Sequence, residues 1–197
     1  MSKRLLSAGF LSISLVAAAC GGGDASDVAA VAEPGVVQTT PLIDITANHV
    51  EPPVEFSSSP STGGDHYQFW MNCGFYTEEV IEGAATHSLE HGAIWITYND
   101  SLAEEELGAL EALASGNPRL LISPYDHDDP IVLSAWGAQL RGVTSASAPE
   151  VQTFIDDWAD NPALGEAGAS CGNAVGVPPD DPNTLFDGTP VPEEFLS

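Results

Sequence analysis

The chain has 197 residues, of which 29 are Asp or Glu and only four are Lys or Arg. Its formal net charge of −25 at pH 7 repels nucleic acid and anionic lipid surfaces, so we exclude nucleic-acid binding. The charge also attracts cations in a general way. Solubility or a salty medium explains it equally well, and no D-x-D-x-D-G calcium loop is present.

The chain begins with the features of a secretory signal. Lys3 and Arg4 precede the apolar stretch LLSAGFLSISLVAAA, which is short for a membrane span, and Cys20 follows. A cysteine directly after three alanines resembles the lipobox of bacterial lipoproteins, which implies cleavage after residue 19 and lipidation of Cys20. We therefore expect a signal peptide at 1–19 and a protein anchored to the membrane through Cys20, outside the cytoplasm in the bacterial cell envelope. Ordinary signal cleavage, with Cys20 unmodified, is the alternative.

Composition divides the rest of the chain into three parts. Residues 20–41 are Gly, Ala, Asp, Val and Pro in no periodic order, which predicts a flexible tether after the lipidated cysteine. Residues 42–171 contain the patterned segments and are expected to form one compact domain. Residues 172–197 are a tail rich in Pro and Asp that either wraps the surface or stays mobile.

The first regular elements of the domain are a strand and a helix. AIWITY (93–98) is a continuous apolar run with high β-propensity, typical of a buried strand. Ser101 and Glu104 have the spacing of a capping box, which predicts that a helix begins at Ser101. Leucines on one face continue the helical pattern until Gly116 ends it.

Two further strands and a helix complete the pattern. RLLIS (119–123) and the run at 131–142 are expected to pair as a hairpin, and Pro149 begins a last helix. The order of elements predicts an α+β fold, in which helices pack on a small mixed sheet. The part of the domain before residue 66 is expected to be irregular and rich in loops.

Cys73 and Cys171 are the cysteines left after Cys20. In an oxidising compartment such a pair usually forms a disulfide, worth about 4–5 kcal/mol for a loop of this length. The alternative makes Cys73 a metal ligand.

The segment THSLEHG carries the clearest chemical signal. One or two helical turns ended by Gly92 would place His87 and His91 on one face, where both imidazoles could bind one metal ion. The order H-x-x-E-H also matches the inverted zinc-peptidase motif, in which Glu90 would be the general base. That motif lies inside a long helix, whereas a strand follows at once here.

The remaining histidines lie in loops. His49 and His66 flank segments without regular pattern, and His127 lies in the acidic turn DHDDP, where solvent exposure is expected. Each could simply satisfy a buried backbone carbonyl. Together His49, His66, His87 and His91 favour a shared metal site. Its expected outer partners are Glu90, fixing a histidine tautomer, and Asp65, raising the basicity of its neighbour.

The ligand chemistry favours copper or zinc, because imidazole suits both and no carboxylate ligand is required. Met71 could add a soft ligand for Cu(I), although packing among its aromatic neighbours is the better explanation.

Three blocks of the sequence resemble a known family. PSTGGDHYQFWMNCGFY, THSLEHGAIWITYND and LLISPYDHDDPIVLSAWG resemble the signature blocks of the family catalogued as domain of unknown function 3105. The likeness runs from about His49 to Cys171, with Ser59 and Asp65 where prolines are common. It implies a secreted or membrane-tethered bacterial protein without a settled activity. The positions it singles out are His49, His66, Cys73, His87, Glu90, His91, Gly92 and Trp136.

These observations lead to three hypotheses. The favoured one is an envelope lipoprotein that binds copper or zinc, receives it from or passes it to another envelope protein, and is not an enzyme. The second is a zinc-dependent hydrolase with Glu90 as general base. The third is a non-catalytic scaffold lipoprotein whose histidines are structural.

Overall fold

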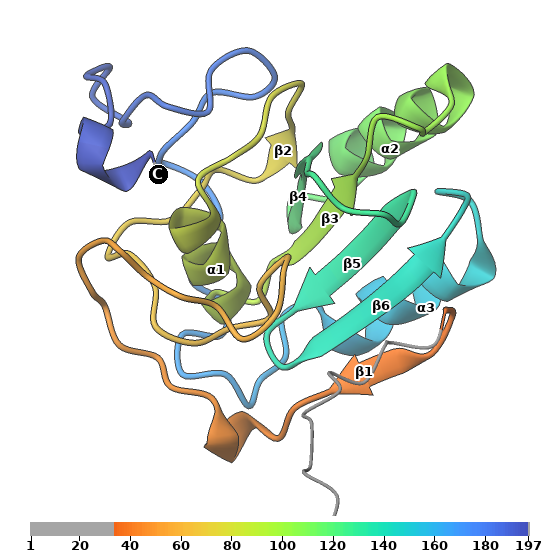
Figure 1. Cartoon of the computed structure of the whole chain (residues 1–197), viewed down its shortest axis with the longest axis horizontal. Coiled ribbons are helices and arrows are strands. Elements are labelled where there is room, and N and C mark those ends of the chain that lie inside the picture. Colours follow the sequence, from red (N-terminus) through yellow and green to blue (C-terminus); the bar gives the residue numbers. More distant parts are fainter. Residues whose placement is uncertain (1–33, 197) are drawn as a thin grey trace, which may run out of the picture. The chain divides into compact units, whose positions relative to one another are not determined.

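The computed structural model describes residues 34–196, so the expected signal peptide and the expected lipidation of Cys20 concern residues outside the described part. The regular elements are six strands, three helices and two 3-10 turns within this range (Figure 1). The strands are β1 (Val37–Thr39), β2 (Gly74–Phe75), β3 (Ile94–Tyr98), β4 (Leu120–Pro124), β5 (Ile131–Ala135) and β6 (Ala138–Val143). The helices are α1 (Glu82–Glu90), α2 (Glu104–Gly116) and α3 (Pro149–Trp158), and the 3-10 turns are Leu42–Asp44 and Glu193–Phe195.

All six strands form one mixed sheet in the order β1-β6-β5-β3-β4-β2. β4 runs parallel to both β3 and β2, whereas β5 is antiparallel to β3, and β6 is antiparallel to β5 and β1. The expected α+β fold with a small mixed sheet is therefore confirmed. None of the helices between residues 34 and 196 is long and apolar enough to cross a membrane.

The expected hairpin between 119–123 and 131–142 is wrong. The second run is two strands, β5 and β6, which pair with each other across a turn at Gly137. The φ of Gly137 is 82°, a conformation that glycine adopts without steric cost. β4 instead pairs with β3 in parallel, and α2 makes the long crossover connection that a parallel pair needs.

The sheet is covered on both faces, and the two faces differ in composition. On one face α2 and α3 pack against aliphatic residues such as Ile94 and Ile96, with Leu110 of α2 fully buried among them. The alternating residue Trp95 points to the other face, where it meets Leu89 of α1. The irregular segments and the C-terminal tail cover α1 on this second face (Figure 1).

The capping box predicted at Ser101 is wrong. The Ser101 hydroxyl donates to Asn99 Oδ1 at 2.6 Å, and α2 begins three residues later, after Ala103, without a side-chain cap. The final helix does begin at Pro149, as expected.

Covalent and packing contacts fix both ends of the compact part. The expected disulfide between Cys73 and Cys171 is present. Residues 37–39, assigned above to the tether, form the edge strand β1 against β6. The tail wraps the surface: Val175 and Phe195 are buried, and the Phe195 ring lies 5.0 Å from that of Tyr67.

Candidate metal centre

Helix α1 places three polar side chains in the interior of the protein. His87 and Glu90 lie on the helix, and His91 follows directly as its C-terminal cap. Gly92, with φ of 92°, ends the helix as expected, and β3 starts at Ile94. The H-x-x-E-H motif therefore lies on a nine-residue helix that ends at a strand, unlike the long helix of the inverted zinc peptidases.

Backbone pairing holds the two loop histidines side by side. The amide of His66 donates to Asn48 O at 3.0 Å, and the amide of Val50 donates to His66 O at 2.8 Å, which places His49 against His66. The Asp65 carboxylate accepts a hydrogen bond from the Asn48 side chain at 2.8 Å. Asp65 thus anchors the segment of His49.

Three of the histidines are held in the same tautomer. The Nδ1 atoms of His66, His87 and His91 lie 2.8, 2.8 and 2.7 Å from the carbonyl oxygens of Gly64, Tyr67 and Ser170, respectively. A carbonyl oxygen can only accept, so each Nδ1 carries the proton. In the neutral ring each Nε2 then has a free lone pair, which is the arrangement found in histidines that bind metals.

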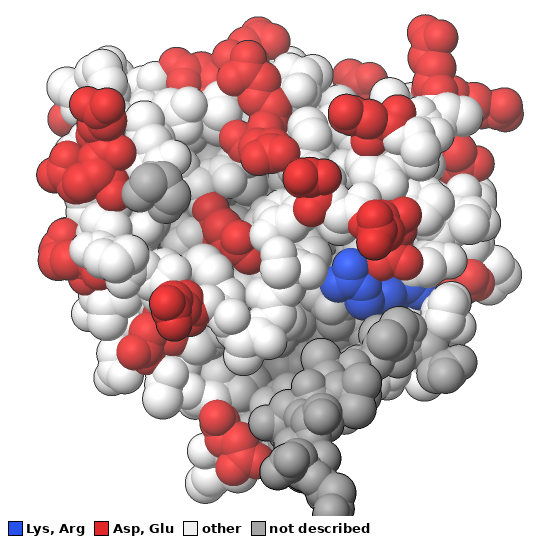
Figure 2. Space-filling view, in the orientation of Figure 1, with Lys and Arg blue, Asp and Glu red and all other residues white. Residues whose placement is uncertain are grey.

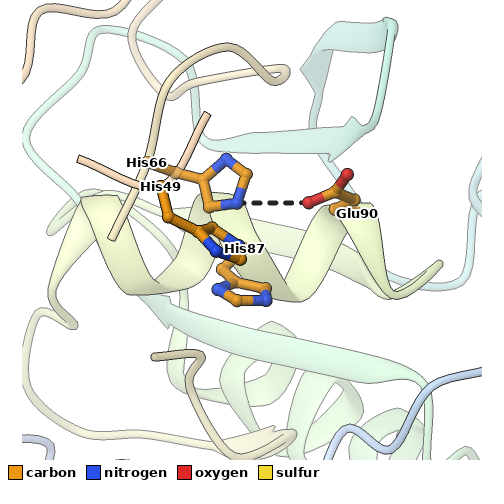
Figure 3. Close-up of side chains that lie close together, drawn as sticks. All are labelled: His49, His66, His87 and Glu90. Atoms are coloured by element: carbon orange, nitrogen blue, oxygen red, sulfur yellow. Dashed lines mark ion pairs between the residues drawn. The ribbon is translucent and has the colours of Figure 1, made fainter. Parts of the chain in front are cut away.

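Four of these groups converge. His49, His66, His87 and Glu90 each offer one ligand atom, and the four atoms lie within 4.8 Å of one another (Figure 3). The His49 ring stacks on that of His87 at 4.7 Å and meets that of His66 at 5.0 Å. His49 is exposed, whereas the other three are buried. We call these four residues the inner set.

The contact between His66 and Glu90 needs a cation. His66 Nε2 is 3.2 Å from Glu90 Oε2, and the two side chains are 0% and 10% exposed. The geometry is not that of a hydrogen bond, so this buried nitrogen has no hydrogen-bond partner among residues 34–196. A lone pair on Nε2 would face a carboxylate oxygen in a dry environment, which is costly unless a proton or a metal ion lies between them.

A second group shares His87 and includes a residue that sequence reasoning missed. Glu166 Oε2 lies 3.0 Å from His91 Nε2 and 3.6 Å from His87 Nε2. We call His87, His91 and Glu166 the outer set. Glu166 lies in a Gly- and Ala-rich loop that no pattern marked, and a side chain at the preceding Gly165 would lie 3.6 Å from Glu90 Oε1.

Burial and neighbouring charges shift the pKa values of His87 and Glu90 toward the protonation states that bind a cation. Burial, aided by the adjacent imidazoles, lowers the pKa of His87 to about 4 despite the raising effect of its bond to Tyr67 O. Burial raises the pKa of Glu90, but its contact with His66 and the nearby histidines outweigh this, so the pKa lies below its usual value. At neutral pH the centre therefore combines a neutral His87 with an ionised Glu90.

The other candidates lie outside the cluster. His127 is half-buried rather than exposed, because its Nε2 hydrogen-bonds with the Thr97 hydroxyl at 2.9 Å. Met71 is fully buried in the aromatic core, and Cys73 is in the disulfide. Two neighbouring cavities of about 550 and 500 Å³ lie beside Tyr125, and none of the cluster residues lines them.

A family model described as protein of unknown function (DUF3105) matches residues 49–173. The chain belongs to this family. The match begins at His49 and includes every residue of the inner and outer sets. No curated protein and no solved structure matches the chain.

Proposed function

We propose that this protein binds one copper or zinc ion through His49, His66, His87 and Glu90. The observation that carries the proposal is the buried Nε2 of His66, which faces the Glu90 carboxylate with its other nitrogen already bonded to a carbonyl. A metal ion between them would satisfy both groups.

The donor set supports the choice of ion. Three imidazole nitrogens and one carboxylate oxygen suit zinc and divalent copper. A soft sulfur ligand, which would favour Cu(I), is not supported because Met71 packs in the core and Cys73 is oxidised. Acidic side chains spread over the face seen in Figure 2 and favour the approach of a cation.

We place this activity in the bacterial cell envelope, with the chain tethered through a lipidated Cys20. Its role there is to hold the ion or to exchange it with a donor or acceptor protein. The exposed ring of His49 supports exchange, because one ligand of the inner set can be reached from solvent while the others stay buried.

The test uses the untagged chain and two single substitutions. Because His49 is exposed and its ring makes no hydrogen bond within the described residues, His49→Ala should leave the fold intact. We expect wild type to retain about one copper or zinc ion after dialysis. His49→Ala should bind the ion more weakly by about 10–100-fold or more, because loss of a mere hydrogen-bond partner of a metal ligand already weakens binding by that range. Elemental analysis and competition with a chelator measure both quantities.

His127→Ala is the matched control, because it removes the histidine that lies outside both sets. It should bind metal as wild type does. Equal weakening by His49→Ala and His127→Ala, or no uptake by wild type when both metals are supplied, would show that the histidines are structural.

Glu90→Gln separates this proposal from the hydrolase alternative. As a ligand, Glu90 contributes to affinity, so the variant should lose metal. As a general base acting on metal-bound water, the same substitution should leave the ion bound and abolish turnover.

A further inference from the structure

His87 belongs to both ligand sets, but only one of its ring nitrogens can bind a metal ion. Its Nδ1 proton is donated to Tyr67 O at 2.8 Å, so only Nε2 can bind a metal. The inner set uses this nitrogen together with His49, His66 and Glu90, and the outer set uses it with His91 and Glu166. A single lone pair cannot serve two ions at once, so the two sets exclude each other.

The outer set resembles the inner one in its donor types, but its histidine and carboxylate are within hydrogen-bond geometry. His91 Nδ1 donates to Ser170 O, which leaves Nε2 facing Glu166 Oε2 at 3.0 Å. The histidine side chains are 3% exposed, and Glu166 is 43% exposed. Because a carboxylate oxygen accepts, either a proton on His91 Nε2 or a metal ion can join these two groups.

We propose that the inner and outer sets are two alternating positions for one ion, and that His87 stays bound to it in both. This inference rests on the proposed metal binding. The two sets meet at His87 Nε2, so the ion changes position by exchanging its remaining ligands around one retained bond.

Each position has one solvent-exposed ligand, and the two come from different parts of the chain. His49 belongs to the inner set and lies in the segment between β1 and β2, whereas Glu166 belongs to the outer set and lies in the loop before Cys171. The two sets therefore form a short row of ligands, which we call the track. It has an exposed ligand, His49 or Glu166, at each end and buried histidines between them. Such a track suits transfer of an ion between two partners better than permanent storage.

The experiment uses Cu²⁺ as the probe and electron paramagnetic resonance as the readout, on the untagged chain. Wild type should bind one Cu²⁺ per chain and show two overlapping spectral components. Glu166→Gln should lose one component and keep the stoichiometry, and this exposed substitution does not threaten the fold. His49→Ala should shift the spectrum toward the component that Glu166→Gln removes.

Glu111→Gln is the matched control, since it removes one exposed carboxylate from α2, which packs on the opposite face of the sheet. It should leave both components unchanged. Two Cu²⁺ per wild-type chain, or a spectrum that Glu166→Gln does not alter, would overturn the alternating positions while leaving metal binding intact. No Cu²⁺ uptake by wild type would overturn both proposals.

Discussion

The two faces of the sheet are built on the same strands but differ in their buried residues and in the elements that cover them. Under α2 and α3 the buried residues are nearly all aliphatic, and regular helices cover them. Under α1 the buried residues include aromatic rings and the polar groups of His66, His87 and His91, and irregular segments complete the cover. The comparison indicates that the first face mainly stabilises the fold. The second face is packed less regularly and instead holds the buried histidines of the candidate metal centre.

The largest expected effect is on the aliphatic face. Leu110 is fully buried there, so Leu110→Ala should cost about 2–5 kcal/mol of unfolding free energy through lost burial and a cavity. Metal affinity of the folded variant should remain that of wild type, because α2 packs on the face of the sheet opposite α1. Urea unfolding and a metal titration measure the two effects. A large loss of affinity would show that the faces are coupled.

Gly92→Ala should have the next largest effect, on the other face. The φ of 92° disfavours any side chain, and a Cβ there would lie 2.9 Å from the Asp160 Cα. We expect a loss of about 1–3 kcal/mol in unfolding free energy, together with weaker metal binding because His91 is the preceding residue. Gly108→Ala is the control: Gly108 is helical with open space around it, so the variant should gain up to about 1 kcal/mol.

The smallest expected effect at pH 7, where it vanishes, is a pH dependence confined to the histidine face. His87 binds its proton less readily when folded, with a pKa of about 4 against 6.5 for the free side chain. The unfolded chain therefore takes up the proton first, and stability of the metal-free protein should fall as pH drops from about 6.5 to 4. One proton contributes at most about 1.4 kcal/mol per pH unit. Thermal melts with a chelator should show a shallower slope for His87→Gln, and an unchanged slope would contradict the assignment.

Local patterns were enough to predict the elements of the aliphatic face. The strands at β3 and β4 and the start of α3 follow from apolar runs and from Pro149, because these signals act over a few residues. Strand pairing was not predictable in the same way. A hairpin between neighbours in sequence is the simplest choice, but β3 lies between β4 and β5 and pairs with both.

The candidate site could be predicted only in part, for a similar reason. His87, Glu90 and His91 share a helix, so their spacing alone placed them together. His49 and His66 were grouped by composition, and backbone pairing across 17 residues brings them together. Glu166 could not be found: the expected disulfide ties only Cys171, and the hydrogen bond from Arg119 to Ala169 O that also holds the loop has no local signature.

The disulfide also makes the geometry of the candidate metal centre depend on the redox state of the chain. The Ser170 carbonyl that orients His91 and the loop that carries Glu166 both lie beside Cys171, which is tied to Cys73 across 98 positions of the chain. Until that bond forms, only noncovalent contacts hold the segment around Cys171 against the segment around Cys73. In a reduced chain the loop that carries Glu166 would thus be held less firmly beside His91. If the proposed metal site is correct, oxidation of the two cysteines should therefore tighten metal binding through the outer set.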